Sequence, residues 1–238
     1  MTMTRRRAGA LIAGGAGMAF VPGCGAGGGE ARLKFKVIAR AQLPGADYEG
    51  FAVNEMRASY TPNSLTGFMM GRTLKMEATV VDFGGEGDAL FVLLTDYLPV
   101  ILWTWGIAPS AGAADEKTIS SLKAATGLRA IPQEDPALAG RYSLYPKLCA
   151  FRDEADPTSV YEVDPDNLAK THGPGAKFLG LSIEIVDPKT PLTTSIMQRL
   201  PWLSDTSGKG LVPAEHLQPM RELSFGQLLT NRDFRGLP

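Results

Sequence analysis

The sequence predicts an α+β to mainly β fold, built on an antiparallel sheet, a sandwich or an open barrel with a few short helices. Two observations predict it. Segments in which apolar and polar side chains alternate recur along the chain, and each is typical of a half-buried antiparallel strand. Strands and short helices follow one another without the regular alternation of a parallel α/β protein. The chain has 238 residues, 44% of them hydrophobic, so we expect one domain with a substantial core.

The clearest strand covers Leu33–Leu43, where apolar side chains at every second position alternate mostly with lysine, arginine and glutamine. Phe51–Tyr60 is a weaker strand candidate. Leu74–Val80 alternates again, and the glycine-rich connector Gly84–Asp88 separates it from the apolar segment Ala89–Leu94. Two strands around such a connector predict a hairpin, with its second strand inside the sheet.

The best helix candidate is Asp115–Gly127. Its apolar residues Ile119, Leu122 and Ala125 fall on one stripe, acidic residues occupy its first turn, and a glycine ends it. A shorter helix is predicted over Asp166–Lys170, because Asp164-Pro165 is typical of a helix cap followed by a first-turn proline.

The remaining elements are short. Strands are predicted at Leu148–Phe151, Ser159–Val163 and Phe178–Val186, the last with Leu179, Leu181, Ile183 and Ile185 facing inward. A short helix is predicted over Leu192–Leu200, ended by Pro201, and Leu223–Leu229 is a last possible element.

The first 25 residues have the layout of an export signal. Three consecutive arginines, Arg5–Arg7, precede the apolar and uncharged segment Ala8–Pro22. This segment has 15 residues, fewer than the ~20 that a membrane-spanning helix needs. Its four glycines weaken a helix by about 1 kcal/mol each relative to alanine. A removable signal is therefore favoured over a permanent transmembrane anchor.

Val21-Pro22-Gly23-Cys24 resembles the lipobox of bacterial lipoprotein precursors. Val21, Gly23 and Cys24 match that pattern, whereas Pro22 departs from it. The resemblance implies cleavage before Cys24 and acylation of Cys24. Thr4-Arg5-Arg6, before a glycine- and alanine-rich segment, also resembles a twin-arginine export signal. Ordinary cleavage after Ala26, which would release a soluble exported protein, is the alternative.

These signals predict the organisation and location of the chain. We expect a signal peptide at residues 1–23, a flexible tether at 24–30, a single β-rich domain at 31–203, and an extension at 204–238 that is packed on the domain or partly disordered. The expected location is the periplasm. The membrane is a partner through the lipid anchor, and the outer membrane is favoured because glycine, not aspartate, follows Cys24. A second partner could be another envelope protein.

Charge and cysteine content narrow the possibilities further. The formal net charge is −1, so the basic excess of a nucleic-acid binder is missing. Cys24 and Cys149 are the only cysteines. If Cys24 is acylated, Cys149 has no partner within the chain, and its apolar neighbours predict a buried hydrophobic role.

A series of short motifs follows in a fixed order along the body. They are Phe151–Val160, Val163–Pro165, Gly173–Gly175 and Leu200–Leu203, preceded by Leu33–Val37 and Gly84–Leu94. Together they resemble a group of functionally uncharacterised bacterial proteins that are often exported. The resemblance covers about residues 31–203. It implies a single domain and no particular activity.

The densest set of candidate metal ligands is acidic. Asp153, Glu154, Asp156, Asp164 and Asp166 offer the oxygen atoms that a hard cation such as Ca²⁺ prefers. The spacing of an EF-hand loop is missing, so hydrogen bonds to backbone amides within turns are the favoured interpretation. Asp153, Asp156, Asp164 and Asp166, taken with His172, form the alternative of a metal site.

Other catalytic patterns are weaker. Gly84–Asp88 lacks the lysine of a phosphate-binding loop and is expected to be a hairpin loop. His172 and His216 are the only histidines, and His172 is expected in a surface loop. Ser182 lacks the second glycine of a nucleophile elbow. No cofactor is indicated. The sequence therefore favours a non-catalytic binding or structural role in the envelope, with an exported metal-assisted hydrolase as the alternative.

Trp103 and Trp105 are the candidates for a ligand or partner surface. They lie in the apolar segment Tyr97–Ile107. Aromatic side chains can line a binding groove, and an exposed cluster of them marks an interaction site. The alternative interpretation is that this segment belongs to the core.

Overall fold

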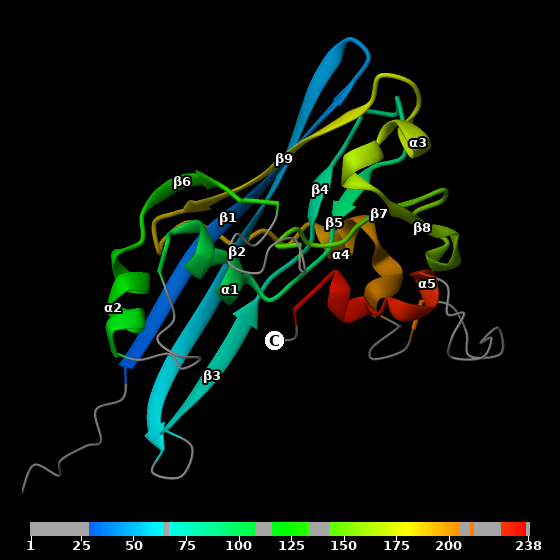
Figure 1. The fold of residues 1–238 in the computed structure, drawn as a ribbon. Helices are drawn as coiled ribbons and strands as arrows, with labels where there is room; N and C mark the ends of the chain where they lie inside the picture. Colours follow the sequence, from blue (N-terminus) through cyan, green and yellow to red (C-terminus); the bar gives the residue numbers. More distant parts are fainter. Residues whose placement is uncertain are drawn as a thin grey trace, which may run out of the picture.

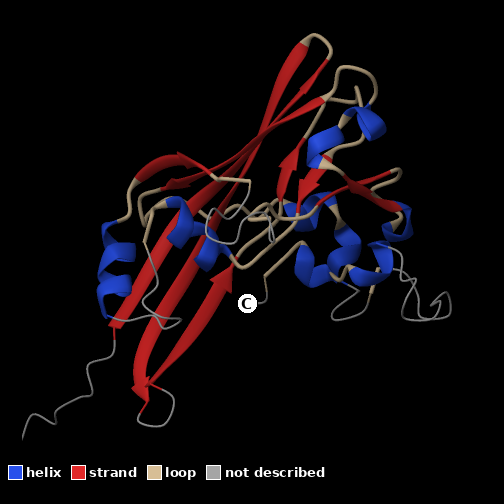
Figure 2. Cartoon of the chain, in the orientation of Figure 1, coloured by secondary structure: helices blue, strands red, loops and turns tan. Residues whose placement is uncertain are grey.

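The computed structural model describes residues 29–63, 67–107, 116–133, 143–204, 210–211 and 225–236. Within these ranges the chain forms two antiparallel sheets with short helices around them (Figures 1 and 2). The predicted α+β to mainly β class is confirmed.

The larger sheet has five strands in the order β3-β2-β1-β9-β6. The two longest strands form its central hairpin, whose turn contains Gly45 in the left-handed region at φ 99°. Figure 1 shows this turn at one end of the molecule and the start of β1 at the other. The strands are β1 (Gly29–Leu43), β2 (Ala46–Asn63), β3 (Gly67–Lys75), β9 (Lys177–Ile185) and β6 (Gly127–Ala130).

The smaller sheet has four strands in the order β4-β5-β7-β8. Both of its faces are covered, because its residues contribute to two separate hydrophobic clusters. Burial on both faces explains why β5 and β7 are continuous apolar runs rather than alternating patterns. The strands are β4 (Thr79–Val81), β5 (Leu90–Val92), β7 (Leu148–Phe151) and β8 (Val160–Val163).

The helices are short. The α-helices are α1 (Tyr97–Thr104), α2 (Glu116–Ala124), α3 (Ala169–His172), α4 (Ile196–Arg199) and α5 (Phe225–Leu228). Single turns of 3₁₀ helix occur at Pro157–Ser159, Pro165–Asn167, Pro201–Ser204 and Asn231–Asp233. Among the described residues, no helix is both long enough and apolar enough to cross a membrane.

The main core lies between the two sheets and under α1 and α2. Strand β1 contributes every second residue to it, from Ala31 to Leu43, as the alternation of the sequence predicts. Helix α2 adds Ile119 and Leu122, and all but three residues of α1 are buried. The burial of α1 around most of its circumference explains why its sequence shows no helical periodicity.

A second core covers the other face of the smaller sheet. Four aromatic rings meet there, from Phe91 on β5, Phe151 on β7, and Trp202 and Phe234 nearer the end of the chain. Leu211 and Leu229 are buried in the same cluster. Described residues of the C-terminal extension are therefore part of a hydrophobic core.

The predicted hairpin around Gly84–Asp88 exists, but its first strand is shorter than expected. Thr79–Val81 pairs with Leu90–Val92, and β5 lies inside the smaller sheet as predicted. The expected single strand Leu74–Val80 is wrong, because Lys75 ends β3 in the larger sheet and Thr79 begins β4 in the smaller one. The alternation of apolar and polar residues continues while the chain passes from one sheet to the other, so the alternation alone does not reveal where β3 ends and β4 begins.

One residue of β9 faces the other way from the prediction. Leu181 and Ile183 are buried as expected, but the side chain of Leu179 is 48% exposed. The pairing of β1 with β9 shifts at this point, since Arg40 lies opposite Gly180 whereas Ala41 lies opposite Phe178. This β-bulge leaves Leu179 as the extra residue and reverses the alternation.

Three helix predictions are confirmed in position, with different bounds. Where a helix is predicted over Asp166–Lys170, a 3₁₀ turn at Pro165–Asn167 is followed by α3. The helix expected over Asp115–Gly127 is α2, and Gly127 begins β6 instead of ending the helix. Asp115 and Leu223 lie outside the described residues. Only the last turn of the expected Leu192–Leu200 helix forms, as α4, because the residues before it cross the outer face of the larger sheet.

That crossing segment, residues 186–195, is held to the sheet by hydrogen bonds to β1 and to β2. Lys34 Nζ donates to the carbonyl oxygen of Thr190 (2.7 Å), and the amide of Thr193 donates to the carbonyl oxygen of Val53 (3.2 Å). The segment runs from the end of β9 across β1 and β2 to α4 (Figure 1). It thereby brings α4 next to the junction between β3 and β4.

Candidate functional site

The acylation candidate Cys24 lies outside the described residues. The first described residue, Gly29, begins β1 and follows Cys24 by five positions. A fully extended chain advances at most about 3.6 Å per residue. An anchor at Cys24 would therefore keep the start of β1 within roughly 18 Å of the acylated residue.

The acidic residues of the candidate metal set form local turns. Asp153 accepts from the amide of Ala155 (2.9 Å), and Asp164 caps the 3₁₀ turn after β8 by accepting from the amide of Asp166 (2.9 Å). Asp156 accepts from the hydroxyl and the amide of Thr158, and these bonds lower the pKa of the Asp156 carboxyl.

The fourth carboxylate of the set bonds to another loop. Asp166 accepts from the side-chain amide of Gln133 at 2.7 Å. Among the described residues, no group of three or more histidine, cysteine, aspartate and glutamate side chains is placed to hold a metal ion. The structure therefore does not assemble the alternative metal site from Asp153, Asp156, Asp164, Asp166 and His172.

His172 is not in a surface loop, contrary to expectation. It ends α3 and its ring is half-buried against Phe83, with the ring centroids 5.3 Å apart. Its Nε2 lies 3.0 Å from the carbonyl oxygen of Asp88, and its Nδ1 lies 2.9 Å from Oγ1 of Thr171. A carbonyl only accepts, so Nε2 carries a proton.

The hydroxyl of Thr171 can satisfy either protonation state of His172. It also lies 3.2 Å from the carbonyl oxygen of Leu168. When the imidazole is neutral, the hydroxyl donates to Nδ1. When the imidazole is protonated, Nδ1 donates to the hydroxyl, which then donates to Leu168. Burial of the ring nevertheless lowers the pKa of His172 and favours its neutral form.

We expect His172→Gln to reduce the loss of stability of the fold on acidification. The pKa of His172 is lower in the folded chain than in the unfolded chain. As the pH falls through about 6.5, the unfolded chain therefore binds a proton at His172 more readily than the folded chain does. The wild-type protein should therefore lose stability relative to the variant as the pH falls from 7.5 to 5. Urea unfolding at both pH values measures this difference.

Lys170→Gln, an exposed change on the same helix, is the matched control and should keep the pH dependence of the wild type. The charged groups nearest the ring, Asp88 and Arg152, are unchanged in both variants. Equal losses of stability in the wild type and in His172→Gln would contradict the expectation.

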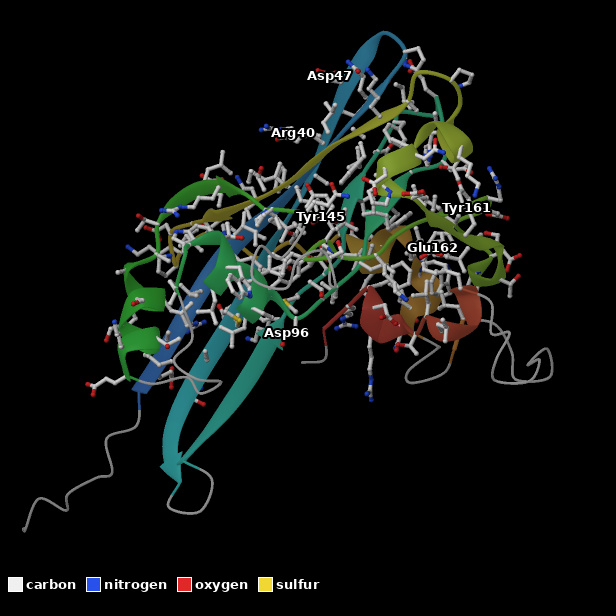
Figure 3. All side chains as sticks on the ribbon, viewed as in Figure 1. Arg40, Asp47, Asp96, Tyr145, Tyr161 and Glu162 are labelled. Atoms are coloured by element: carbon white, nitrogen blue, oxygen red, sulfur yellow. The ribbon has the colours of Figure 1, made fainter. Side chains whose placement is uncertain are left out.

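A polar cluster around Asp88 was not predicted. Asp88, in the loop before β5, accepts from Arg152 Nη1 (3.0 Å) and from the hydroxyl of Tyr161 (2.8 Å) through the same oxygen, Oδ2. The Arg152 guanidinium also lies over the Tyr161 ring, 4.2 Å from its centroid. Figure 3 shows Tyr161 on β8, close to α3. Burial, followed by the bond to Asp88, raises the pKa of Tyr161.

This cluster joins parts of the chain that are distant in the sequence, since 84 positions separate His172 from Asp88. The hydrogen bonds described above run between members of the cluster or to nearby backbone. It therefore fastens the β4–β5 loop and α3 to the smaller sheet, and its chemistry is that of a structural network.

The side chains of Trp103 and Trp105 are both half-buried. Trp105 packs against the main core, and its Nε1 donates to the carbonyl oxygen of Thr126 (3.2 Å). The guanidinium of Arg129 lies 5.4 Å from its ring centroid. Trp105 therefore lies where the end of α1 meets β6 and packs against the core, as the alternative interpretation expected, whereas Trp103 lies on α1.

Cys149 is fully buried within β7, as its apolar neighbours predicted. Burial, with a smaller contribution from the charge of Asp233, raises the pKa of its thiol well above the ordinary value. The thiol is therefore protonated at neutral pH and lacks the thiolate character of a reactive cysteine.

A pocket of about 240 Å³ lies where three separate segments meet, and we take it as the candidate binding site. Its walls come from the junction between β3 and β4, from the end of the crossing segment with α4, and from the C-terminal residues. Most of its lining is apolar, with a few polar groups, as is usual for ligand sites. The lining residues are Lys75–Glu77, Leu192–Thr194, Ile196, Met197, Arg235 and Gly236.

Backbone hydrogen bonds hold the C-terminal wall of the pocket in place. The amide of Gly236 donates to the carbonyl oxygen of Met76 (2.8 Å), and the amide of Ala78 donates to that of Phe234 (2.8 Å). Glu77 and Arg235 form a bridge of antiparallel type between these bonds. The C-terminal residues thus pair like a short strand beside the β3–β4 junction.

The second wall is held by Glu77, whose side chain is buried. Its Oε1 accepts from the amide and the hydroxyl of Ser195, at 3.2 and 3.1 Å, and its Oε2 accepts from the amide of Ile196 at 3.2 Å. A carboxylate at the first amides of a helix satisfies donors that have no partner within the helix. Glu77 therefore fixes the start of α4 at the pocket.

Comparison of the chain with protein-family models, with curated proteins and with solved structures found no match in any of the three.

Proposed function

We propose that this chain is an exported, lipid-anchored envelope protein whose body is a non-catalytic binding module. The observation that carries the proposal is the order of features in the first 24 residues: consecutive arginines, an uncharged apolar segment, and Cys24 at its end. Several buried acyl chains hold a protein durably at a bilayer, whereas one short chain holds it only marginally.

The position of β1 indicates which end of the anchored protein faces the membrane. Anchoring at Cys24 places the start of β1 nearest the membrane. Figure 1 shows α2 beside the start of β1, and α3 toward the opposite end of the molecule. At the start of β1, Glu30 pairs with Arg57 (2.5 Å), and Arg32 pairs with Glu55 (2.8 Å). In this orientation the Asp88 cluster faces away from the bilayer.

The candidate catalytic groups already hydrogen-bond to other groups of the protein or are buried, which supports a binding role over a catalytic one. Asp153, Asp156 and Asp164 accept hydrogen bonds within turns, and Asp166 accepts from Gln133. Glu154 pairs with Arg199, and His172 bonds to Asp88 and Thr171. Cys149 is buried and protonated. The described geometry gives no support to the alternative of a metal-assisted hydrolase, whereas the preformed apolar pocket suits a ligand.

Labelling of the expressed chain with radioactive palmitate tests the anchor. We expect the wild-type protein to carry the label in the membrane fraction and Cys24→Ser to carry none, because Cys24 is the residue that the lipobox presents for acylation. Cys149→Ser is the matched control, since it removes the other cysteine and should leave labelling unchanged.

Two outcomes would contradict the proposal. One is an unlabelled, soluble wild-type protein whose new N-terminus follows Ala26. The other is a full-length, unprocessed chain in the cytoplasm. Mass spectrometry of the purified protein distinguishes both from the acylated form that begins at Cys24.

A further inference from the structure

We propose that the pocket between the β3–β4 junction, α4 and the C-terminal residues binds a medium-chain carboxylate, with its alkyl chain inside and its carboxylate at Lys75 and Arg235. The inference rests on the proposed function in taking the body to be a binding module, and it names the class of ligand. It does not depend on acylation of Cys24.

The inner part of the pocket suits an alkyl chain. Met76 and Ile196 are buried, and Leu192 and Met197 are half-buried beside them. The volume of about 240 Å³ equals that of about eight waters in the liquid, at ~30 Å³ each. It therefore fits a single chain of roughly eight to ten carbon atoms. Binding an alkyl chain here is favourable, because it removes apolar surface of both the pocket and the chain from water.

The outer part of the pocket suits an anion. Lys75 and Arg235 line it from opposite strands of the pairing at the β3–β4 junction, and both are exposed to solvent. The one acidic lining residue, Glu77, faces the donors of Ser195 and Ile196 instead. Two cations beside an apolar cavity are complementary to a ligand with an apolar chain and a negative head.

The pocket is preformed, which favours binding of a small ligand. Gly236 and Phe234 bond to the backbone on one side, and Glu77 fixes the start of α4 on the other. Walls that are already held in place do not lose further conformational entropy when a ligand enters. A single small amphiphile is therefore a better fit than a partner that must reshape the surface.

Isothermal titration calorimetry with decanoate, below its micelle concentration, tests the proposal. The full chain carrying Cys24→Ser is used, so that no acyl chain of its own competes. Lys75→Gln with Arg235→Gln should weaken binding about fivefold, the usual range for exposed ion pairs. Leu192→Trp, which fills the cavity from a half-buried position, should weaken binding by about tenfold or more.

The matched control is Arg232→Gln, which removes the same charge from an exposed residue three positions before Arg235 that does not line the pocket. It should bind decanoate within about twofold of the parent protein. Decanol, which lacks the charge, should bind the parent more weakly than decanoate does.

Any one of three binding results would overturn the proposal. They are no binding of decanoate by the parent protein, equal binding by the parent and Leu192→Trp, and equal binding of decanoate and decanol. A dimer in analytical ultracentrifugation that Leu192→Trp dissociates would also overturn it, by assigning the pocket to a second copy of the chain. Palmitate labelling at Cys24 is unaffected by any of these results, so the two proposals fail separately.

Discussion

Gly50→Ala is expected to destabilise the fold by about 3 kcal/mol or more. Gly50 lies on β2 where this strand passes β4, and a Cβ added there would lie 1.8 Å from the carbonyl oxygen and 2.5 Å from the carbonyl carbon of Val80. Real Cβ contacts under 3.0 Å essentially do not occur. Because both contacts are with backbone atoms, no side-chain rotation relieves them, and β2 must separate from β4.

The effect is attributable to this contact alone. Gly50 is not among the glycines with positive φ, so alanine introduces no backbone strain of its own. Replacing glycine also restricts the unfolded chain, which by itself would stabilise the protein by about 0.4–1 kcal/mol. Any measured destabilisation therefore understates the cost of the clash between the two sheets.

Chemical denaturation monitored by circular dichroism measures the difference in the free energy of unfolding. Gly87→Ala is the matched control, since its Cβ would lie 3.8 Å from Cδ2 of His172, an ordinary contact distance. The free energy of unfolding of Gly87→Ala should be within about 0.5 kcal/mol of that of the wild type. A Gly50→Ala protein as stable as the control would show that the two sheets do not pack this closely.

The close approach at Gly50 illustrates which parts of the fold the sequence could predict. Strands β1, β7 and β8 were found because each carries a local signal, an alternation or a compact apolar run. The cap at Asp164 was found because its oxygen bonds to an amide two residues on. Such signals lie within a single element and do not depend on which other elements pack against it.

The elements that the sequence missed, α1 and β6, or predicted only as a weaker strand candidate, Phe51–Tyr60 within β2, are those whose burial depends on distant neighbours. Residues 52–56 of β2 are buried on both sides, because the crossing segment covers their outer face, and alternation disappears there. Helix α1 is buried around most of its circumference, and β6 is exposed throughout. None of the three shows the one-sided pattern that identifies an amphipathic element.

The candidate site was beyond prediction for a related reason. The pocket is made where Lys75, Leu192 and Arg235 meet, and no spacing in the sequence brings these positions together. The Asp88 cluster likewise joins the β4–β5 loop to Arg152 after β7, to Tyr161 on β8 and to His172 at the end of α3. His172 was identified as noteworthy by residue type, but its partners became evident only from the fold.

Phe234→Ala is expected to destabilise the fold by about 3–5 kcal/mol, the usual range for a buried phenylalanine. The Phe234 ring is fully buried, and its centroid lies 5.7 Å from that of Phe151 and 6.0 Å from that of Trp202. Removing it leaves a cavity among aromatic rings that are themselves packed against β5 and β7. Chemical denaturation measures the loss, and the near-ultraviolet circular dichroism of Trp202 should weaken with it.

The matched control is Phe51→Ala, because Phe51 is 51% exposed and its truncation should cost at most about 1 kcal/mol. The comparison also tests where the domain ends. The motif resemblance covers residues up to about 203, yet Leu229 and Phe234 complete the second core and Gly236 pairs with Met76. A loss as small as that of Phe51→Ala would mean that the domain ends near Leu203. The full expected loss would make residues 225–236 part of the folding unit, and the pocket wall that they form would then be as stable as the core.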